Sequence, residues 1–255
     1  MNNMWSRLKQ AAPLWVTLAF VIGLALFTRF YQLGHTPQGI TWDEAALGYV
    51  GKMVITTTYD EYGERFPTTF QSFGDYKSPL AFYLTGLSTT LFGINAWATR
   101  LPFALAGVGS VALIMWLVWR LWREPWIALL AGWLLTTLPW HFLHSRVGFE
   151  AGIVVFWLLL LLIGWVELHH VNPTTKRWQI IFSASLMVIG TVASLYTYHA
   201  AKLVVPLFVA TAILHDILHH HQWIRQQRTA LAAYVLGSGV LSLPLIFDMV
   251  MGPGM

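Results

Sequence analysis

The chain contains no cysteine, and only 10% of its 255 residues carry a charge. The absence of cysteine excludes disulfides, thiolate metal sites and cysteine nucleophiles. Soluble domains average about 25% charged residues, so this shortage of charge, together with 56% hydrophobic residues, is typical of a membrane protein. The 15 basic residues are scattered among apolar blocks instead of forming a basic stripe, so we expect no nucleic-acid partner.

Long apolar runs fill most of the sequence. A membrane-spanning helix needs about 20 mostly apolar residues. The first run follows Arg7 and Lys9 and has no A-x-A-like exit, so we interpret it as an uncleaved transmembrane helix and not as a signal peptide. The expected fold class is an all-α polytopic membrane protein with about seven transmembrane helices, at residues 11–30, 98–119, 126–144, 150–168, 179–197, 202–218 and 229–247.

An eighth apolar run, residues 78–93, is shorter than a typical span. It aligns Leu80, Leu84, Leu87 and Leu91 on one helical face, which favours an amphipathic helix lying in the membrane interface. If this run does not cross, every inner loop carries a basic pair, as the positive-inside rule requires. We therefore expect a multi-pass protein of the cell (inner or plasma) membrane, with the N-terminus cytoplasmic and the C-terminus outside. The inner basic pairs are then Arg7/Lys9, Arg120/Arg123, Lys176/Arg177 and Arg225/Arg228.

This topology leaves one long extracytoplasmic loop, residues 31–97, which carries most of the acidic residues. Two shorter outer segments, 144–150 and 196–202, also carry ionisable groups. Polar residues in loops on a rigid scaffold are where function usually lies, so we expect the functional site on this side. The acids of the long loop are Asp43, Glu44, Asp60, Glu61, Glu64 and Asp75.

Asp43 and Glu44 lie in a segment that fits a capping box, with Thr41 as N-cap and Glu44 as the third helical residue. The apolar spacing downstream predicts an amphipathic helix over residues 42–55. The capping box gives Glu44 a structural role but gives none to Asp43. An acid held where membrane meets water can be partly desolvated and act as a base. A structural and a catalytic interpretation of the acid pair both stay open on the residues alone.

Four segments in order carry a family resemblance: "RFYQLG", "TWDEAALGYVGK", "DYKSPLAFYL" and "NAWATRLPFALAG". The chain resembles the N-terminal half of the C-type membrane glycosyltransferases of family 39, which include protein O-mannosyltransferases and the lipid A aminoarabinose transferase. The shared elements are an Asp-Glu pair in the first outer loop, a Lys-Pro-Pro-Leu-like element before an apolar helix, and a following Arg-Leu-Pro. The resemblance implies that residues 1–255 are an N-terminal transmembrane module, truncated at the C-terminus.

The resemblance also implies roles for individual residues. Asp43 corresponds to the catalytic acid/base that takes the proton from the acceptor hydroxyl, with Glu44 as its supporting neighbour. Lys77 corresponds to the lysine that faces the phosphate of a polyprenyl-phosphate sugar, although Ser78 stands in place of the first proline of the element. Tyr76 stands where the aminoarabinose enzymes have a glutamate, so a divalent metal cofactor stays an open question and no residue is assigned to a metal.

The chemistry of such a transfer requires an acid/base group and a cation, whether or not the family resemblance is considered. Displacing a lipid phosphate from an anomeric carbon needs a base on the attacking hydroxyl and positive charge on the departing phosphate. Lys77 and Arg100, both near the outer face, are the candidates for binding that phosphate, and the alternative for each is a snorkelling interface anchor. Further candidates for the donor or acceptor pocket are Trp42, Asp75, Tyr76, Arg146, Glu150, His199 and Lys202.

Two other groups of ionisable residues have structural explanations. Arg146 and Glu150 are spaced i, i+4 at the start of a span, which indicates either a mutual ion pair or part of a polar cavity. The runs His169-His170 and 219–221 place histidines side by side. Adjacent helical side chains point about 100° apart, so we expect these histidines to be solvated at the interface and not to bind a metal.

The expected function is transfer of a sugar from a polyprenyl-phosphate donor to a hydroxyl of a protein, lipid or glycan at the extracytoplasmic face. The resemblance implies inversion at the anomeric carbon. The alternative is a non-catalytic membrane protein for lipid binding or transport, or an inactive truncated module. Transporters tend to have paired halves with broken helices, and the sequence lacks such symmetry, which favours the enzyme.

Overall fold

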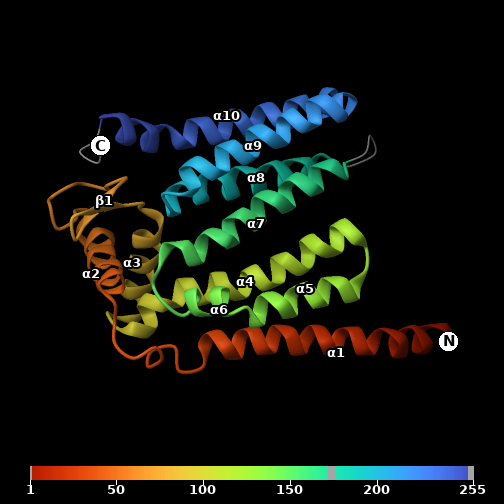
Figure 1. The fold of residues 1–255 in the computed structure, drawn as a ribbon, viewed down its shortest axis with the longest axis horizontal. Coiled ribbons are helices and arrows are strands. Elements are labelled where there is room, and N and C mark those ends of the chain that lie inside the picture. Colours follow the sequence, from red (N-terminus) through yellow and green to blue (C-terminus); the bar gives the residue numbers. More distant parts are fainter. Residues whose placement is uncertain (1, 172–175, 252–255) are drawn as a thin grey trace.

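The computed structural model describes residues 2–171 and 176–251, with side chains described from residue 12 onward. Its long helices lie side by side, and a cap of short elements covers one end of them (Figure 1). In chain order the elements are α1 (Asn2–Phe30), α2 (Trp42–Thr57), β1 (Phe70–Ser72), β2 (Asp75–Lys77), α3 (Leu80–Phe92), α4 (Ala96–Trp122), α5 (Pro125–Thr137), α6 (Pro139–His144), α7 (Glu150–His169), α8 (Arg177–Thr197), α9 (Ala201–His219) and α10 (His221–Met251).

Six helices are long and apolar enough to cross a membrane: the segment Ala12–Phe30 of α1, and α4, α7, α8, α9 and α10. They coincide with six of the seven predicted spans, so the helical polytopic fold class is confirmed. The remaining predicted span, 126–144, is divided between α5 and α6. Leu138 has extended backbone angles (φ −62°, ψ 114°), because the ring of the following Pro139 disfavours a helical conformation there.

The loops sort into two ends of the bundle (Figure 1). The α4–α5 and α9–α10 connections, the end of α7 and the start of α8 lie at the same end as the start of α1, whereas α2, α3 and the β1–β2 hairpin cover the other end. The basic residues Arg123 and Lys176 therefore lie at one end of the bundle, as the sidedness prediction requires. The compartment that each end faces stays a prediction. Residues 252–255, where the expected truncation falls, lie outside the described residues.

The cap is built on a close packing of α2 against α3. A Cβ atom on Gly86 of α3 would lie 2.2 Å from the backbone oxygen of Gly51 of α2, so only glycine permits this approach. Thr85 of α3 is buried, whereas Leu87 and Leu91 are 51% and 67% exposed. Helix α3 thus turns its small residues toward the protein and Leu87 and Leu91 outward, which favours the predicted interfacial location.

Replacing Gly86 by alanine is expected to lower the free energy of unfolding by about 1–3 kcal/mol, because the added methyl group overpacks the α2–α3 contact. The measurement is denaturant unfolding in detergent. Gly23→Ala is the matched control, since a Cβ at Gly23 meets nothing within 4 Å and alanine favours helix over glycine. Equal stabilities for the two variants would contradict the proposed role of the glycine contact.

The β1–β2 hairpin was not predicted from the sequence. Its strands pair antiparallel, with Phe70 opposite Lys77. The two turn residues, Phe73 and Gly74, have positive φ angles of 50° and 81°. Positive φ at both positions is the turn geometry that matches the twist of a two-residue hairpin. The turn therefore fixes the register of β2 and places Lys77 directly before α3.

Candidate active site

Asp43, Lys77 and Glu150 come together from three separate elements at the capped end of the bundle. Asp43 lies in the first turn of α2, Lys77 ends β2, and Glu150 begins α7. The Nζ atom of Lys77 donates to Oδ1 of Asp43 at 2.6 Å and lies 3.8 Å from Oε1 of Glu150. The side chain of Asp43 is 36% exposed, against 13% for Lys77 and 6% for Glu150. Asp43 is thus the member of the cluster that solvent or an acceptor can reach.

The electrostatics of the cluster hold Lys77 in its charged form. Burial alone would lower its pKa, but the hydrogen bond to Asp43 and the nearby charges of Glu150, Asp43 and Asp75 outweigh burial and raise it. The Oε1 atom of Glu150 is buried and makes no hydrogen bond within the described residues. This Glu150 oxygen therefore lies near the Lys77 ammonium, at 3.8 Å, without accepting a hydrogen bond from it.

The pair between Lys77 and Asp43 predicts a dependence of stability on alkaline pH. Because the pKa of Lys77 is raised in the folded state above the ordinary 10.5, the pair stabilises the fold fully below pH 10.5, and this contribution is lost as pH rises through the folded-state pKa. We expect the difference in unfolding temperature between wild type and Lys77→Met to be constant near neutral pH and to shrink at high pH. Lys52→Met is the control, because it removes a lysine of α2 and leaves the ion pair between Lys77 and Asp43 intact.

Behind this cluster, Glu44 and Arg100 form a buried ion pair. The Nε atom of Arg100 donates to Oε1 of Glu44 at 2.6 Å, and both side chains are 1% exposed. The Thr41 amide donates to Oε2 of Glu44 at 2.9 Å while the Glu44 amide donates to the Thr41 hydroxyl at 3.2 Å, so the predicted capping box is confirmed. Burial would raise the pKa of Glu44, but hydrogen bonds from Arg100, Thr41 and the Gly148 amide lower it on balance. Glu44 is a charged anchor for the start of α2.

Arg100 is the clearest departure from the expected site. Its Nη1 donates to the carbonyl oxygens of Leu33 and Pro37, both at 3.0 Å. Its Nη2 donates to Gly39 O at 2.6 Å and to Glu44 Oε2 at 3.2 Å. A guanidinium has five N–H donors, and with the Nε bond to Glu44 all five are engaged. We therefore assign Arg100 to holding the 33–39 segment against α2, in place of the phosphate-binding role expected from the sequence.

Arg146 also binds backbone carbonyls. Its Nη1 donates to Thr28 O at 2.6 Å, and its Nη2 donates to Tyr31 O and Thr36 O, each at 2.8 Å. The mutual ion pair with Glu150, one of the two alternatives that the sequence indicated, is wrong. Helix α7 begins only at Glu150, so Arg146 precedes it in a non-helical segment and the i, i+4 spacing does not bring the two side chains together.

Several predicted pocket residues form the rim of the cluster. Asp75 and Tyr76 lie on β2, and Oδ1 of Asp75 accepts from the Tyr76 amide at 2.8 Å. His199, in the α8–α9 turn, donates from Nε2 to the Tyr76 carbonyl, which ties that turn to the hairpin. Trp42 is 75% exposed, and its ring lies 5.5 Å from that of Phe73 in the hairpin turn. The structure thus brings these four predicted residues around Lys77.

Lys202 lies near a different acid, Asp248 of α10, which sequence reasoning missed. Lys202 is within electrostatic range of Asp248, and the Thr69 hydroxyl donates to Oδ2 of Asp248. Asp248 and Tyr76 both line a small polar pocket of about 60 Å³. An acid at the end of an apolar span is a functional-site signal by default, and that signal could have identified Asp248.

A divalent metal does not fit the Asp43 cluster. The ammonium of Lys77 bridges the carboxylates of Asp43 and Glu150 that such an ion would need. Tyr76 supplies no carboxylate, and its carbonyl is bonded to His199. Within the described parts of the chain, three metal-capable side chains converge at the α9–α10 junction instead. We therefore assign no metal to the Asp43 cluster.

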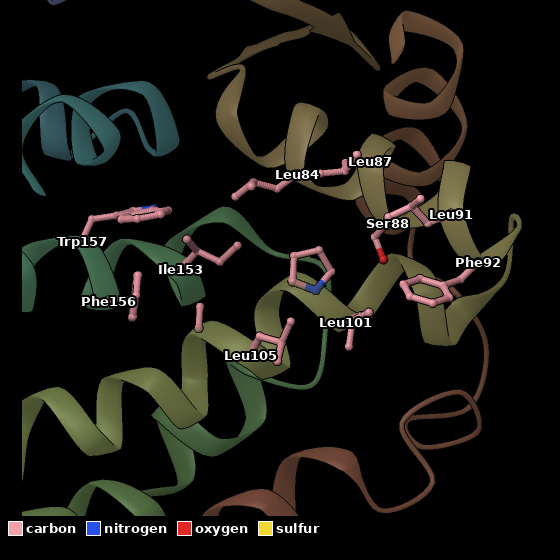
Figure 2. A pocket seen from close by; sticks show the side chains of 12 residues that line it. Leu84, Leu87, Ser88, Leu91, Phe92, Leu101, Leu105, Ile153, Phe156 and Trp157 are labelled. Atoms are coloured by element: carbon pink, nitrogen blue, oxygen red, sulfur yellow. The ribbon is translucent and has the colours of Figure 1, made fainter. Parts of the chain in front are cut away.

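An apolar pocket of about 370 Å³ lies between α3, α4 and α7 (Figure 2). Leu84 and Leu87 of α3, Leu105 of α4, and Ile153 and Trp157 of α7 contribute side chains to it. Ile153 lies one helical turn beyond the first residue of α7. The lining is almost entirely hydrocarbon, so the pocket suits a lipid chain better than a water-soluble ligand.

Known proteins share both the sequence pattern and the fold. The Bacillus subtilis (strain 168) protein YkcB, which carries a provisional name as a mannosyltransferase, is 24% identical over 245 residues, covering 94% of this chain and 32% of YkcB. Two crystal structures of ArnT from Cupriavidus metallidurans, apo and bound to undecaprenyl phosphate, match with TM-scores of 0.69 and 0.65 at 17% and 16% identity. Each match covers 96% of this chain and 43% of the ArnT chain.

The chain thus spans about a third of YkcB and less than half of ArnT. Residues 19–247 match the sequence profile of the family described as dolichyl-phosphate-mannose-protein mannosyltransferase. That match includes the cap, the Asp43 cluster and nearly all of the helical bundle. The chain therefore belongs to the dolichyl-phosphate-mannose-protein mannosyltransferase family.

Proposed function

We propose that this chain is the membrane part of a glycosyltransferase that moves a sugar from a polyprenyl-phosphate donor to an acceptor hydroxyl. The observation that carries the proposal is an acid and an ammonium, Asp43 and Lys77, held 2.6 Å apart at the edge of a membrane bundle. Family membership supports the reaction class, and the fold shared with ArnT, which binds undecaprenyl phosphate, supports the donor class. Because the chain covers 32% of YkcB and 43% of ArnT, the activity of the whole protein is part of the proposal.

Lys77 is the group that would meet the donor phosphate. Its ammonium is charged and already bound to the Asp43 carboxylate. An arriving phosphate offers Lys77 another charge-assisted hydrogen bond and competes with Asp43 for it. Donor binding would thereby free Asp43 from its ion pair, while Lys77 stabilises the negative charge that grows on the departing phosphate.

Asp43 is the group that would take the proton from the acceptor hydroxyl. It is the most exposed member of the cluster, at 36%, so an acceptor can approach it from solvent. The bond from the acceptor oxygen to the anomeric carbon forms as the bond to the phosphate oxygen breaks, and attack from the opposite side inverts that carbon. The buried anchor formed by Glu44 and Arg100 holds the first turn of α2, and so Asp43, in position for this attack.

The polyprenyl chain would lie in the apolar pocket of Figure 2. Ile153, which lines the pocket, lies one turn beyond Glu150 on α7. A donor whose phosphate binds Lys77 would therefore place the first part of its lipid tail beside Ile153. The capped end would face the extracytoplasmic side of the cell membrane, because Arg123 and Lys176 lie at the opposite end of the bundle. A protein, lipid or glycan hydroxyl would reach Asp43 from that side.

A role in lipid binding or transport without chemistry is the second candidate. The apolar pocket of about 370 Å³ favours this second candidate, because it can hold a lipid tail whether or not a catalytic base is present. The two candidates differ in the fate of the sugar. A transferase separates the sugar from the lipid phosphate, whereas a binding protein leaves the donor intact.

The test is to incubate membranes containing the inserted chain with a panel of radiolabelled polyprenyl-phosphate sugars. We expect label to appear on an endogenous acceptor and free polyprenyl phosphate to be released. Donor binding without release would support the binding protein instead. If the correctly inserted protein neither binds a donor nor transfers its sugar, both candidate functions are contradicted for this chain.

A further inference from the structure

The junction between α9 and α10 gathers histidine and aspartate side chains. His215 and Asp216 lie near the end of α9, and His220 lies between the two helices. One ligand atom from each of these three residues lies within 4.8 Å of the other two. This junction is at the opposite end of the bundle from the cap that carries Asp43 (Figure 1).

The convergence depends on where α9 stops. The helix ends at His219, and His220 has non-helical backbone angles (φ −131°, ψ 38°) although its amide still donates to Asp216 O at 2.8 Å. The chain therefore turns back at His220, and the rings of His215 and His220 lie 5.8 Å apart. The sequence argument against a metal considered only adjacent histidines, whereas His220 meets His215 and Asp216, which lie about one helical turn earlier.

Asp216 is held like a metal ligand. Its side chain is 4% exposed, and its Oδ2 accepts from Nε2 of His169 of α7 at 3.0 Å. The His169 ring stacks on Trp223 of α10, with centroids 3.8 Å apart and an interplanar angle of 6°. The Trp223 indole in turn donates to Leu168 O at 3.3 Å. A ligating carboxylate is normally oriented by such an outer hydrogen bond, so Asp216 is preorganised.

We propose that His215, Asp216 and His220 bind one divalent transition-metal ion, with His169 orienting the carboxylate. Two imidazoles and a carboxylate suit Zn²⁺, Co²⁺ or Ni²⁺ better than Mg²⁺ or Ca²⁺. Three protein ligands leave a further position for water. His215 and His220 are exposed, so their side chains can rotate inward to complete the coordination. The bound ion holds His220, the residue between α9 and α10, against the end of α9, remote from the Asp43 cluster.

The test is calorimetric titration of the 255-residue chain with Zn²⁺, in detergent, after purification through a tag that contains no histidine. The absorption spectrum of bound Co²⁺ is a second readout. We expect one saturable site per chain and a higher unfolding temperature with Zn²⁺. The double variant His215→Ala/His220→Ala should lose this site, and His169→Ala should weaken it roughly 10–100-fold.

The matched control is His170→Ala/His221→Ala, which removes the same number of histidines from the same end of the bundle. It should bind Zn²⁺ as the wild type does. Equal loss in both double variants would assign the binding to a histidine-rich surface and overturn the proposal. Absence of saturable Zn²⁺ binding by the wild-type chain would overturn it as well. Because His215 and His220 are exposed, their variants should keep the wild-type unfolding temperature in the absence of metal.

Discussion

Asp43→Asn is expected to lower sugar transfer by about 10²–10⁴-fold, the usual contribution of a general base. Asparagine keeps the size of the side chain and can still accept a hydrogen bond from Lys77, but it cannot take the acceptor proton. The side chain of Asp43 is 36% exposed and its ion-pair partner is Lys77, so the variant should fold and bind donor. The measurement is transfer from labelled polyprenyl-phosphate sugars in membranes with matched amounts of inserted protein.

The control for this variant is Glu61→Gln, which removes an exposed acid from the same 31–97 segment and should transfer at the wild-type rate. Lys77→Met should act differently from Asp43→Asn, because it removes the positive charge proposed to hold the phosphate and should weaken donor binding itself. An Asp43→Asn protein that folds, binds donor and transfers sugar at the full rate would exclude Asp43 as the general base. Asp43 would then retain only its place in the first turn of α2.

Arg100→Met is expected to lower the free energy of unfolding by about 3–5 kcal/mol, because breaking a buried ion pair leaves one charge uncompensated. Glu44 would stay buried without its guanidinium, and the carbonyls of Leu33, Pro37 and Gly39 would lose their donors. Denaturant unfolding in detergent measures this loss. Arg225→Met, which changes an exposed arginine of α10, should leave the stability almost unchanged.

The same variant should change the response to acid. In the wild type the pKa of Glu44 is lowered, so the pair stabilises the fold above pH 4.5, the ordinary value, and this contribution is lost as pH falls through the folded-state pKa. Without Arg100, burial dominates and the pKa of Glu44 should rise. Lowering the pH should therefore reduce the difference in the free energy of unfolding between Arg100→Met and the wild type. The double variant Glu44→Gln/Arg100→Met should be more stable than Arg100→Met alone. Additive effects of the two single changes would contradict coupling between the residues.

Much of the helical fold could be predicted because it follows from local composition. A window of about 20 apolar residues has few alternatives to a spanning helix, and six predicted windows coincide with such helices. The start of α2 was equally local, since Thr41 and Glu44 form a capping box within four residues of sequence. Both signals lie in the order of neighbouring residues, and no distant contact is needed to read them.

The hairpin and the break between α5 and α6 were missed for different reasons. Proline is tolerated within many membrane helices, and α4 continues through Pro102, so Pro139 did not distinguish a break from a kink. The turn that carries Gly74 needs φ > 0 at Phe73 as well. Phenylalanine seldom adopts such an angle, and the sequence therefore gave no turn signal there.

The partners of the buried arginines could not be predicted at all. Arg100 meets Glu44 across 56 residues of sequence, and the other acids of residues 31–97 offered several equally plausible partners. Arg146 prefers three carbonyl oxygens to the nearby Glu150, and a carbonyl has no signature in a sequence. The grouping of His215 with His220 likewise depends on a chain reversal that only the folded structure supplies.

Arg100 and Arg146 hold the stretch from Thr28 to Gly39 through hydrogen bonds that they donate to its main-chain oxygens. A carbonyl oxygen is the same whichever side chain its residue carries, so these contacts by themselves place no demand on the side chains of the residues that supply the oxygens. Its length is not free, because one inserted or deleted residue would move the oxygens out of reach of both guanidinium groups. Natural variants should therefore keep the number of residues between 28 and 39 and the two arginines, even where exposed residues of this stretch, such as Tyr31 and His35, are replaced.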